Sequence, residues 1–238
     1  MRIYSSFEEA YDEIKRNVGE LGTRTELYSM QDKIVEGDPD WGVTKELIGE
    51  TYQLVNVRSQ EVLDYMKKNG YSIEWVEGEF KERISEDFVN PGEAWKHRKE
   101  VWDEFLKKEN GKFSYTYNER YRLSLKKVID ELKKHKTTRQ AVLGMWDINK
   151  DPDRFATLRV PCSTMYQFLI RKNSKGEDEL HIIYIMRSSD VIEHFVYDVC
   201  LTLMLQEHVA KEVGVKPGHF THFIGSMHAY QKDLHGVF

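Results

Sequence analysis

The segment that most constrains the fold is Val191 to Val213, which has the length and apolar density of a buried helix. A helix that is apolar on all sides must be covered by other elements. Runs rich in β-branched, aromatic and aliphatic residues surround it, at 164–170 and 180–186 before it and at 219–230 after it. The polar segment 172–178 predicts that the first two runs are neighbouring antiparallel strands. We therefore expect strands to lie beside this helix.

Weaker periodicity in the rest of the chain supplies the remaining elements. We expect helices at 7–18, 61–68, 73–84, 91–108 and 122–134, strands at 47–57 and 141–146, an irregular loop at 22–42, and a break at Pro217-Gly218. This order predicts an α+β fold, with a mixed sheet covered by helices. A chain of 238 residues without repeats or a linker predicts a single domain over 1–238.

Composition limits the binding partners and the cellular compartment that we expect for this protein. A net charge of −5 argues against a broad basic surface for nucleic acid, so an anionic ligand must be held by a local group of arginines. The only two cysteines, Cys162 and Cys200, suggest a reducing compartment, and we expect the cytoplasm. The segment from Met1 to Ala10 has no long apolar run, so we expect neither a signal peptide nor a membrane partner.

Cys162 follows Pro161 at the mouth of an expected strand. An intracellular cysteine is most often a small buried hydrophobe, so its neighbours decide the interpretation. The segments 159–168, 186–191 and 225–230 contain, in order, Pro-Cys, Gln-Phe, Arg-Ser-x-Asp-Val and His-x-Tyr. This arrangement resembles the thymidylate synthase superfamily over about residues 110 to 232.

The resemblance implies a thymidylate synthase-like sheet, one face of which forms the interface of a homodimer. It also implies a reaction in which the Cys162 thiolate adds to carbon 6 of a pyrimidine nucleoside monophosphate. Carbon 5 then attacks the one-carbon unit of the cosubstrate 5,10-methylenetetrahydrofolate. Nearby cationic side chains would favour the thiolate.

The residues that match the family's nucleotide-binding positions are Arg24, Arg139, Gln167, Arg187, Ser188, Asp190, His228 and Tyr230. The resemblance makes Arg187 a phosphate ligand, although a surface salt bridge is the alternative for it. Arg139 matches the first of two arginines that reach the neighbouring subunit's phosphate, which implies shared active sites. Gln140 replaces the second, so this phosphate site has one charge fewer.

Two further residues match catalytic positions less closely. Tyr117 lies in a segment similar to the family's Tyr-Gly-x-x-Trp-Arg, without its glycine and tryptophan. It relays a proton at carbon 5 or simply packs. Alignment backward from Trp102 brings Glu79 near the position of the catalytic glutamate, with Glu82 as the neighbouring choice. A solvated helix face is the alternative for both glutamates.

The resemblance implies that Asp198 is the position that selects the base. Counting from Arg187, it occupies the place of the asparagine that reads uracil in thymidylate synthases. An ionised carboxylate only accepts hydrogen bonds and therefore disfavours the uracil 4-oxygen, whereas the 4-amino group and protonated ring nitrogen of cytosine both donate. An aspartate here resembles the deoxycytidylate and cytidylate 5-hydroxymethylases. The alternative for Asp198 is a helix N-cap.

The chain ends eight residues after Tyr230, without the family's folate-covering extension, which favours trapping by water and hence hydroxymethylation. Two other functions stay open: a nucleotide methylase of the same superfamily and an inactive nucleotide-binding homologue. A metal site built from His219, His222, His228 and His235 is a further alternative, but their spacing fits no standard zinc pattern. We expect no metal.

Overall fold

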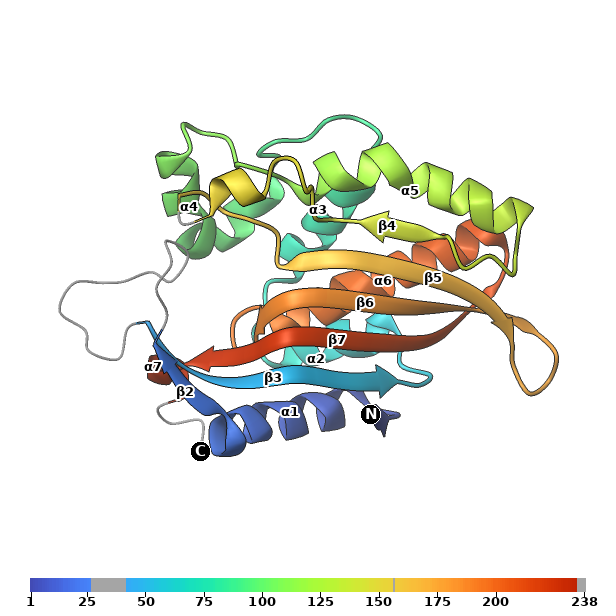
Figure 1. Ribbon diagram of the computed structural model, residues 1–238, viewed down its shortest axis with the longest axis horizontal. Helices are drawn as coiled ribbons and strands as arrows, with labels where there is room; N and C mark the ends of the chain where they lie inside the picture. The colour runs from blue at the N-terminus through green and yellow to red at the C-terminus, as the bar shows by residue number, and fades with distance from the viewer. Residues whose placement is uncertain (27–41, 156, 235–238) are drawn as a thin grey trace.

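The computed structural model describes residues 1–26, 42–155 and 157–234 (Figure 1). Its helices are α1 (Phe7–Leu21), α2 (Ser59–Lys68), α3 (Ile73–Ile84), α4 (Lys99–Lys108), α5 (Tyr117–Lys134), α6 (Phe195–Val213) and α7 (Gln231–Leu234). Its strands are β1 (Arg2–Tyr4), β2 (Thr23–Glu26), β3 (Val43–Leu54), β4 (Val142–Gly144), β5 (Ser163–Lys172), β6 (Asp178–Asp190) and β7 (Lys216–Tyr230). Two 3₁₀ turns, η1 (Ala94–Arg98) and η2 (Pro152–Arg154), complete the described elements.

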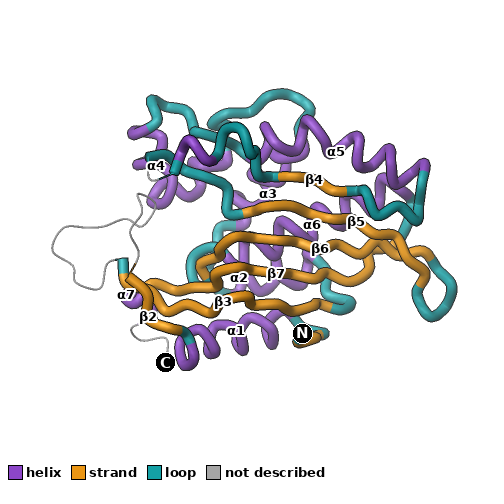
Figure 2. Tube along the Cα trace, in the orientation of Figure 1, coloured by secondary structure: helices purple, strands orange, loops and turns teal. Residues whose placement is uncertain are grey.

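All described strands belong to one mixed sheet. The strand order is β1-β3-β7-β6-β5-β4, and β2 pairs with the N-terminal end of β3. The pairs β1·β3 and β6·β7 are parallel, whereas the other pairs, β5·β6 among them, are antiparallel. Helices α2 and α6 lie behind the sheet in the view of Figures 1 and 2. The structure confirms the α+β fold and the antiparallel pair predicted from 164–170 and 180–186.

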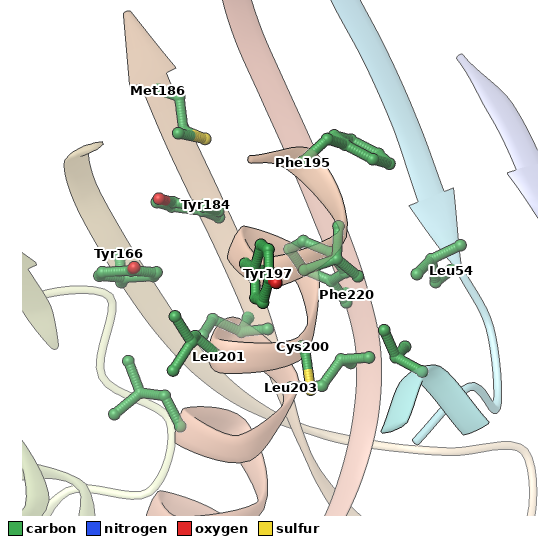
Figure 3. Packing of buried hydrophobic residues seen from close by; sticks show 14 of the residues in the cluster. Leu54, Tyr166, Tyr184, Met186, Phe195, Tyr197, Cys200, Leu201, Leu203 and Phe220 are labelled. Carbon is green, nitrogen blue, oxygen red and sulfur yellow. The ribbon is translucent and has the colours of Figure 1, made fainter. Parts of the chain in front are cut away.

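Side-chain alternation explains why one face of the sheet is covered. On β6, Ile182 and Tyr184 are buried, while Ile183 between them is only half-buried. On β7, Phe220 is buried and Phe223 is 42% exposed. Figure 3 shows side chains of the buried set on the strands facing α6. The opposite face turns toward the viewer in Figure 1, with no described helix in front of it.

Helix α6 is the centre of the hydrophobic core, as the sequence predicts. Twelve of its residues are buried. Burial of each large aliphatic side chain stabilises the fold by about 1.5–3 kcal/mol. The helix ends at Gly214, whose φ of 74° is a left-handed conformation that glycine adopts without strain. Its backbone N–H caps the helix by donating to the carbonyl of Ala210.

The helix predicted at 73–84 has these bounds in the structure, whereas other boundaries move. The helix predicted at 91–108 begins only at Ala94, as η1, and continues as α4. Helix α5 begins earlier than predicted, because the Thr116 side chain caps it by accepting a hydrogen bond from the Glu119 N–H at 3.4 Å.

Two sequence predictions are wrong. Within the loop predicted at 22–42, residues 23–26 form β2, because they pair with β3; residues 27–41 lie outside the described part. Pro217-Gly218 does not break the strand, since β7 begins at Lys216. A register shift in the β6·β7 pairing beside Pro217 accommodates the proline. Gly218 is needed because a Cβ there would lie 2.8 Å from the His181 ring.

Candidate active site

A cavity of about 430 Å³ lies where the start of β5, the end of β6, the N-terminal turn of α6 and helices α3 to α5 meet. Nine of the twelve residues predicted for the site line it: Glu79, Tyr117, Cys162, Arg187, Ser188, Asp190, Asp198, His228 and Tyr230. Arg24, Arg139 and Gln167 are not among the lining residues. Side chains that are far apart in the sequence therefore share one cavity.

Cys162 is half-buried just before β5 and carries a free thiol. Its carbonyl accepts a hydrogen bond from the Arg187 N–H at 2.9 Å, which fixes its backbone to β6. Two donors approach its Sγ: Arg187 Nη2 at 3.7 Å and Ser188 Oγ at 3.8 Å. A second bond, from Arg187 Nε to the Pro161 carbonyl at 2.9 Å, aims the guanidinium at the sulfur. The arrangement suits a thiolate nucleophile, because both donors stabilise its negative charge.

The end of β6 presents a buried carboxyl group beside β7. Asp190 is 7% exposed, and its Oδ1 accepts hydrogen bonds from the N–H groups of Ile192 at 3.0 Å and Glu193 at 3.2 Å. Burial raises the pKa of Asp190 to about 6, and neighbouring His228 opposes the rise. In the parallel β6·β7 pair, Asp190 and His228 lie in register. Tyr230 follows two residues later, and its ring centroid is 5.9 Å from that of His228.

Asp198 lies in the first turn of α6. His194, not Asp198, is the N-cap residue, so the capping alternative is wrong. The hydroxyl of Ser189 donates to Asp198 Oδ2 over a long 3.5 Å. Burial raises the pKa of Asp198 to about 7, while Arg83, Arg98 and the Ser189 bond oppose the rise. This carboxyl group therefore changes its protonation state near neutral pH.

The wall opposite the strands comes from α3 and the start of α5. Glu79 accepts a hydrogen bond from Arg83 Nε at 2.8 Å, and Arg83 is only 5% exposed. The Arg83 guanidinium lies 4.1 Å from the centre of the Tyr117 ring. Glu82, the alternative catalytic glutamate, instead accepts the N–H groups of Glu93 and of Ala94, at 2.6 and 2.9 Å. Both glutamates line the cavity, and burial raises the pKa of Glu82, so both stay candidates for the catalytic glutamate.

Three buried arginines were not predicted from the sequence. Arg83 could have been found from its spacing of four residues from Glu79 on a helix. Arg98 lies over the rings of Tyr197, at 4.2 Å, and Trp75, at 5.0 Å. Arg159 lies over Trp102 at 4.6 Å and three further aromatic rings. No sequence signal indicated the last two, because their ring partners come from distant segments.

The three residues outside the cavity lie in two places. Arg24 is on β2, with a 60% exposed side chain that pairs with Glu26 at 2.8 Å. Arg139 is exposed after α5, and its carbonyl accepts a hydrogen bond from Gln167 Nε2 at 2.9 Å. Gln167 alternates on β5 with buried Tyr166 and therefore points to the uncovered face of the sheet.

Within the described residues, no group of three or more histidine, cysteine, aspartate or glutamate side chains could hold a metal ion. His222, one of the four histidines of the alternative metal site, is buried, and its Nδ1 is hydrogen-bonded to the Tyr52 hydroxyl at 2.9 Å. His235 lies outside the described part of the chain. None of the described helices has the length and hydropathy required to span a bilayer.

Comparison with known proteins decides the family. The family model described as thymidylate synthase matches residues 85–237. The chain belongs to the thymidylate synthase family. A protein of Methanocaldococcus jannaschii named "Putative thymidylate synthase" is 31% identical over 71% of this chain and 85% of its own length. A protein of the same name from Methanopyrus kandleri is 33% identical over 56% of this chain. The thymidylate synthase of Mycoplasma genitalium is 25% identical over 76% of this chain.

This chain spans 62% of the length of both the Methanopyrus and the Mycoplasma protein. Family membership supports a one-carbon transfer to a pyrimidine nucleotide, with methylenetetrahydrofolate as the one-carbon donor of the family. The rings of Trp75 and Trp102 stack on each other at the cavity wall, 6.2 Å apart and 14° from parallel. The N–H of the Trp102 ring is buried without a partner among the described residues, so it offers a donor.

Proposed function

We propose that this protein is a cytidylate 5-hydroxymethylase, which transfers a one-carbon unit from methylenetetrahydrofolate to carbon 5 of dCMP or CMP. The observation that carries the proposal is the carboxyl group of Asp198 in the cavity that holds Cys162. A thymidylate synthase-type reaction needs a nucleophile below the pyrimidine and a group that reads the edge of the base. In this chain that second group is ionisable.

The pKa of Asp198, near 7, allows one proton to be shared between the carboxyl group and ring nitrogen 3 of cytosine. In this pair, the other carboxyl oxygen accepts from the 4-amino group. A proton held at nitrogen 3 withdraws electrons from the ring and favours attack at carbon 6. Uracil instead places an oxygen where cytosine has its amino group, and an ionised carboxylate repels it.

The other cavity residues support the steps of this reaction. Cys162 adds to carbon 6, and the Arg187 and Ser188 donors stabilise the thiolate before addition. Arg187 also offers guanidinium donors for the phosphate. We assign the sugar hydroxyl to His228 and Tyr230, on the adjacent strand end. The folate supplies the one-carbon unit, and Tyr117 and Glu79 provide proton-transfer groups at the cavity wall.

We also propose that the active protein is a homodimer with shared active sites. The uncovered face of the sheet carries Phe223, which is 42% exposed, and half-buried Ile183. Apolar side chains on an open sheet face favour a partner surface. Arg139 and Gln167 lie together at this face and away from the cavity of their own chain, which supports a role for Arg139 in a neighbouring cavity.

The names of the relatives favour a second candidate, methylation of the thymidylate synthase type. The two reactions differ in base and in product. A product assay with CMP, dCMP, UMP and dUMP in the presence of methylenetetrahydrofolate separates them. Hydroxymethylation leaves tetrahydrofolate and adds the mass of CH₂O, whereas methylation yields dihydrofolate and adds CH₂.

The base preference is tested with Asp198→Asn, which should shift activity from the cytidylates toward the uridylates. The matched control is Asp130→Asn, on the exposed face of α5, which should keep the wild-type preference. Strict cytosine preference in Asp198→Asn, or conversion of dUMP to thymidylate by the wild type, would refute the proposal.

A further inference from the structure

Ser163, the residue after Cys162, joins two tyrosines in a chain of hydroxyl groups. It is fully buried at the start of β5. Its Oγ donates to the Tyr117 hydroxyl oxygen at 3.0 Å, and its backbone N–H approaches the same oxygen at 3.4 Å. The Tyr184 hydroxyl lies 2.5 Å from Ser163 Oγ. Because Ser163 gives its one hydroxyl proton to Tyr117, Tyr184 must be the donor in the second bond.

We propose that Ser163 and Tyr184 are positioning residues that set the orientation and the acidity of the Tyr117 hydroxyl. Two donors from Ser163 point at the Tyr117 oxygen, so its own proton is directed away from Ser163. When Tyr117 releases this proton, the negative charge on its oxygen meets donors that are already in place. Consecutive hydrogen bonds polarise one another, so the bond from Tyr184 strengthens the bond from Ser163.

The surroundings of Tyr117 explain why such support is needed. Burial and the neighbouring Tyr115, Cys162 and Asp198 raise the pKa of Tyr117 well above its usual value. Arg83 is the cation that opposes this rise, from above the ring. Without the Ser163 donors, the phenolate form would depend on Arg83 alone.

Tyr184 is held too firmly to move its hydroxyl. Its ring stacks on Tyr166 at 4.3 Å and on His222 at 4.7 Å, with interplanar angles of 9° and 13°. Figure 3 shows Tyr166 and Tyr184 side by side on neighbouring strands. At the other end of this stack, the Tyr52 hydroxyl is hydrogen-bonded to His222 Nδ1 at 2.9 Å and takes no part in the hydroxyl chain to Tyr117. Tyr52 is therefore a matched control for Tyr184.

The catalytic role of this chain of hydroxyl groups rests on the proposed function. In that reaction the C5–H bond breaks, its electron pair stays on the pyrimidine, and the proton passes to the Tyr117 oxygen. The hydroxyl proton of Tyr117 moves to water in the cavity ahead of this transfer, so that negative charge develops on the oxygen that the Ser163 donors stabilise. One proton enters and one leaves, so Tyr117 is unchanged after each turnover.

The hydroxyl chain can be tested without turnover, by NMR of protein labelled with ¹³Cζ-tyrosine. The Tyr117 signal is assigned from its loss in Tyr117→Phe. We expect Ser163→Ala and Tyr184→Phe to shift this signal, because each weakens the bonds that the Tyr117 oxygen accepts. Tyr52→Phe should leave it in place. An unshifted Tyr117 signal in Tyr184→Phe would overturn the inference, whatever the function.

The kinetic test follows tritium release from carbon 5 of labelled cytidylate. Tyr184→Phe should lower kcat about tenfold, a small part of the effect of a general acid–base group, with KM for nucleotide within about twofold. The basic limb of its pH profile should move to higher pH, and Tyr52→Phe should behave as wild type. An unchanged kcat and pH profile in both Tyr184→Phe and Ser163→Ala would also overturn the inference. A shifted NMR signal in a protein that releases no tritium from any pyrimidine nucleotide would refute the proposed function alone.

Discussion

The cavity has a strand wall, formed by the ends of β5, β6 and β7, and a helical wall, formed by α3 and the start of α5. The two walls are held in different ways. On the strand wall, backbone pairing places the residues: the Arg187 N–H binds the Cys162 carbonyl, and Asp190 and His228 lie in register. On the helical wall, side chains hold backbone segments, as Glu82 does for residues 93 and 94. Backbone pairing in a sheet tolerates changes of side chain, whereas the helical wall depends on the particular side chains that bind its backbone groups. The strand wall should therefore keep its geometry when side chains change, whereas the helical wall should be sensitive to single substitutions.

The largest expected effect tests the strand wall. Cys162→Ala should reduce turnover by about 10⁴-fold or more, because loss of a covalent nucleophile removes the whole reaction path. Tritium release from labelled cytidylate measures it. Cys200, fully buried in α6, provides the control: Cys200→Ala should retain activity within a few fold. Substantial release by Cys162→Ala would show that another group adds to carbon 6.

The next effect tests the helical wall. Asn118 is 2% exposed, and its side chain binds the carbonyls of Glu82, Ser85 and Asp87 and the N–H of Val89. Asn118→Ala should lower the free energy of unfolding by about 3 kcal/mol, because buried backbone groups lose their partners. Urea denaturation measures the change.

The control for this change is Asn69→Ala. Asn69 is exposed, and its side chain donates a hydrogen bond to the Tyr65 carbonyl at the end of α2, so its loss should cost less than about 1 kcal/mol. A similar small cost for Asn118→Ala would mean that the helical wall does not depend on this side chain. The contrast between the two walls would then fail.

The same contrast explains how much the sequence could predict. Periodicity identified β5, β6, β7 and α6, because their patterns of buried residues are regular. Motif spacing identified the strand-wall residues, since a short stretch of strand fixes their relative positions. The family model, too, matches only from residue 85 onward. Glu79 was assigned by distant alignment, and both it and the alternative Glu82 line the cavity.

Tertiary contacts explain what the sequence could not predict. Arg98 and Arg159 are buried because aromatic rings from distant segments surround them, and no local pattern encodes that. The chain of hydroxyl groups through Ser163 also joins three separate segments, since it includes Tyr117 and Tyr184. Residues 23–26 seemed irregular because a short, exposed edge strand needs no apolar pattern; only pairing with β3 defines it.

Base selectivity should depend on pH through Asp198. Its pKa is raised to about 7, so below pH 7 the site already holds the proton needed for either base. Above pH 7 that proton must be taken from solvent, and binding weakens by up to about tenfold per pH unit. Cytosine shares the proton through its ring nitrogen and keeps it to higher pH than uracil does. The ratio of CMP to UMP affinity should therefore rise from pH 6 to pH 8.

Calorimetric titration with CMP and UMP at several pH values measures this ratio. Asp198→Asn is the control, because it keeps the titration of the nucleotide phosphate and removes that of the carboxyl group. Its CMP to UMP ratio should not change with pH. A ratio that is equally flat in the wild type would contradict the role of Asp198 in reading the base.

The smallest effect concerns Arg24, which belongs to neither wall. Its side chain is 60% exposed, so Arg24→Ala should change the free energy of unfolding by less than about 0.5 kcal/mol. If Arg24 contacts the phosphate during turnover, as its family position implies, KM for cytidylate should rise several fold, while exposed Arg16→Ala on α1 leaves it unchanged. A KM within twofold of wild type would mean that Arg24 does not bind the phosphate, and that the strand wall and arginines such as Arg139 bind it instead. The strand wall would then supply the nucleophile and every phosphate contact that this chain makes within its own cavity.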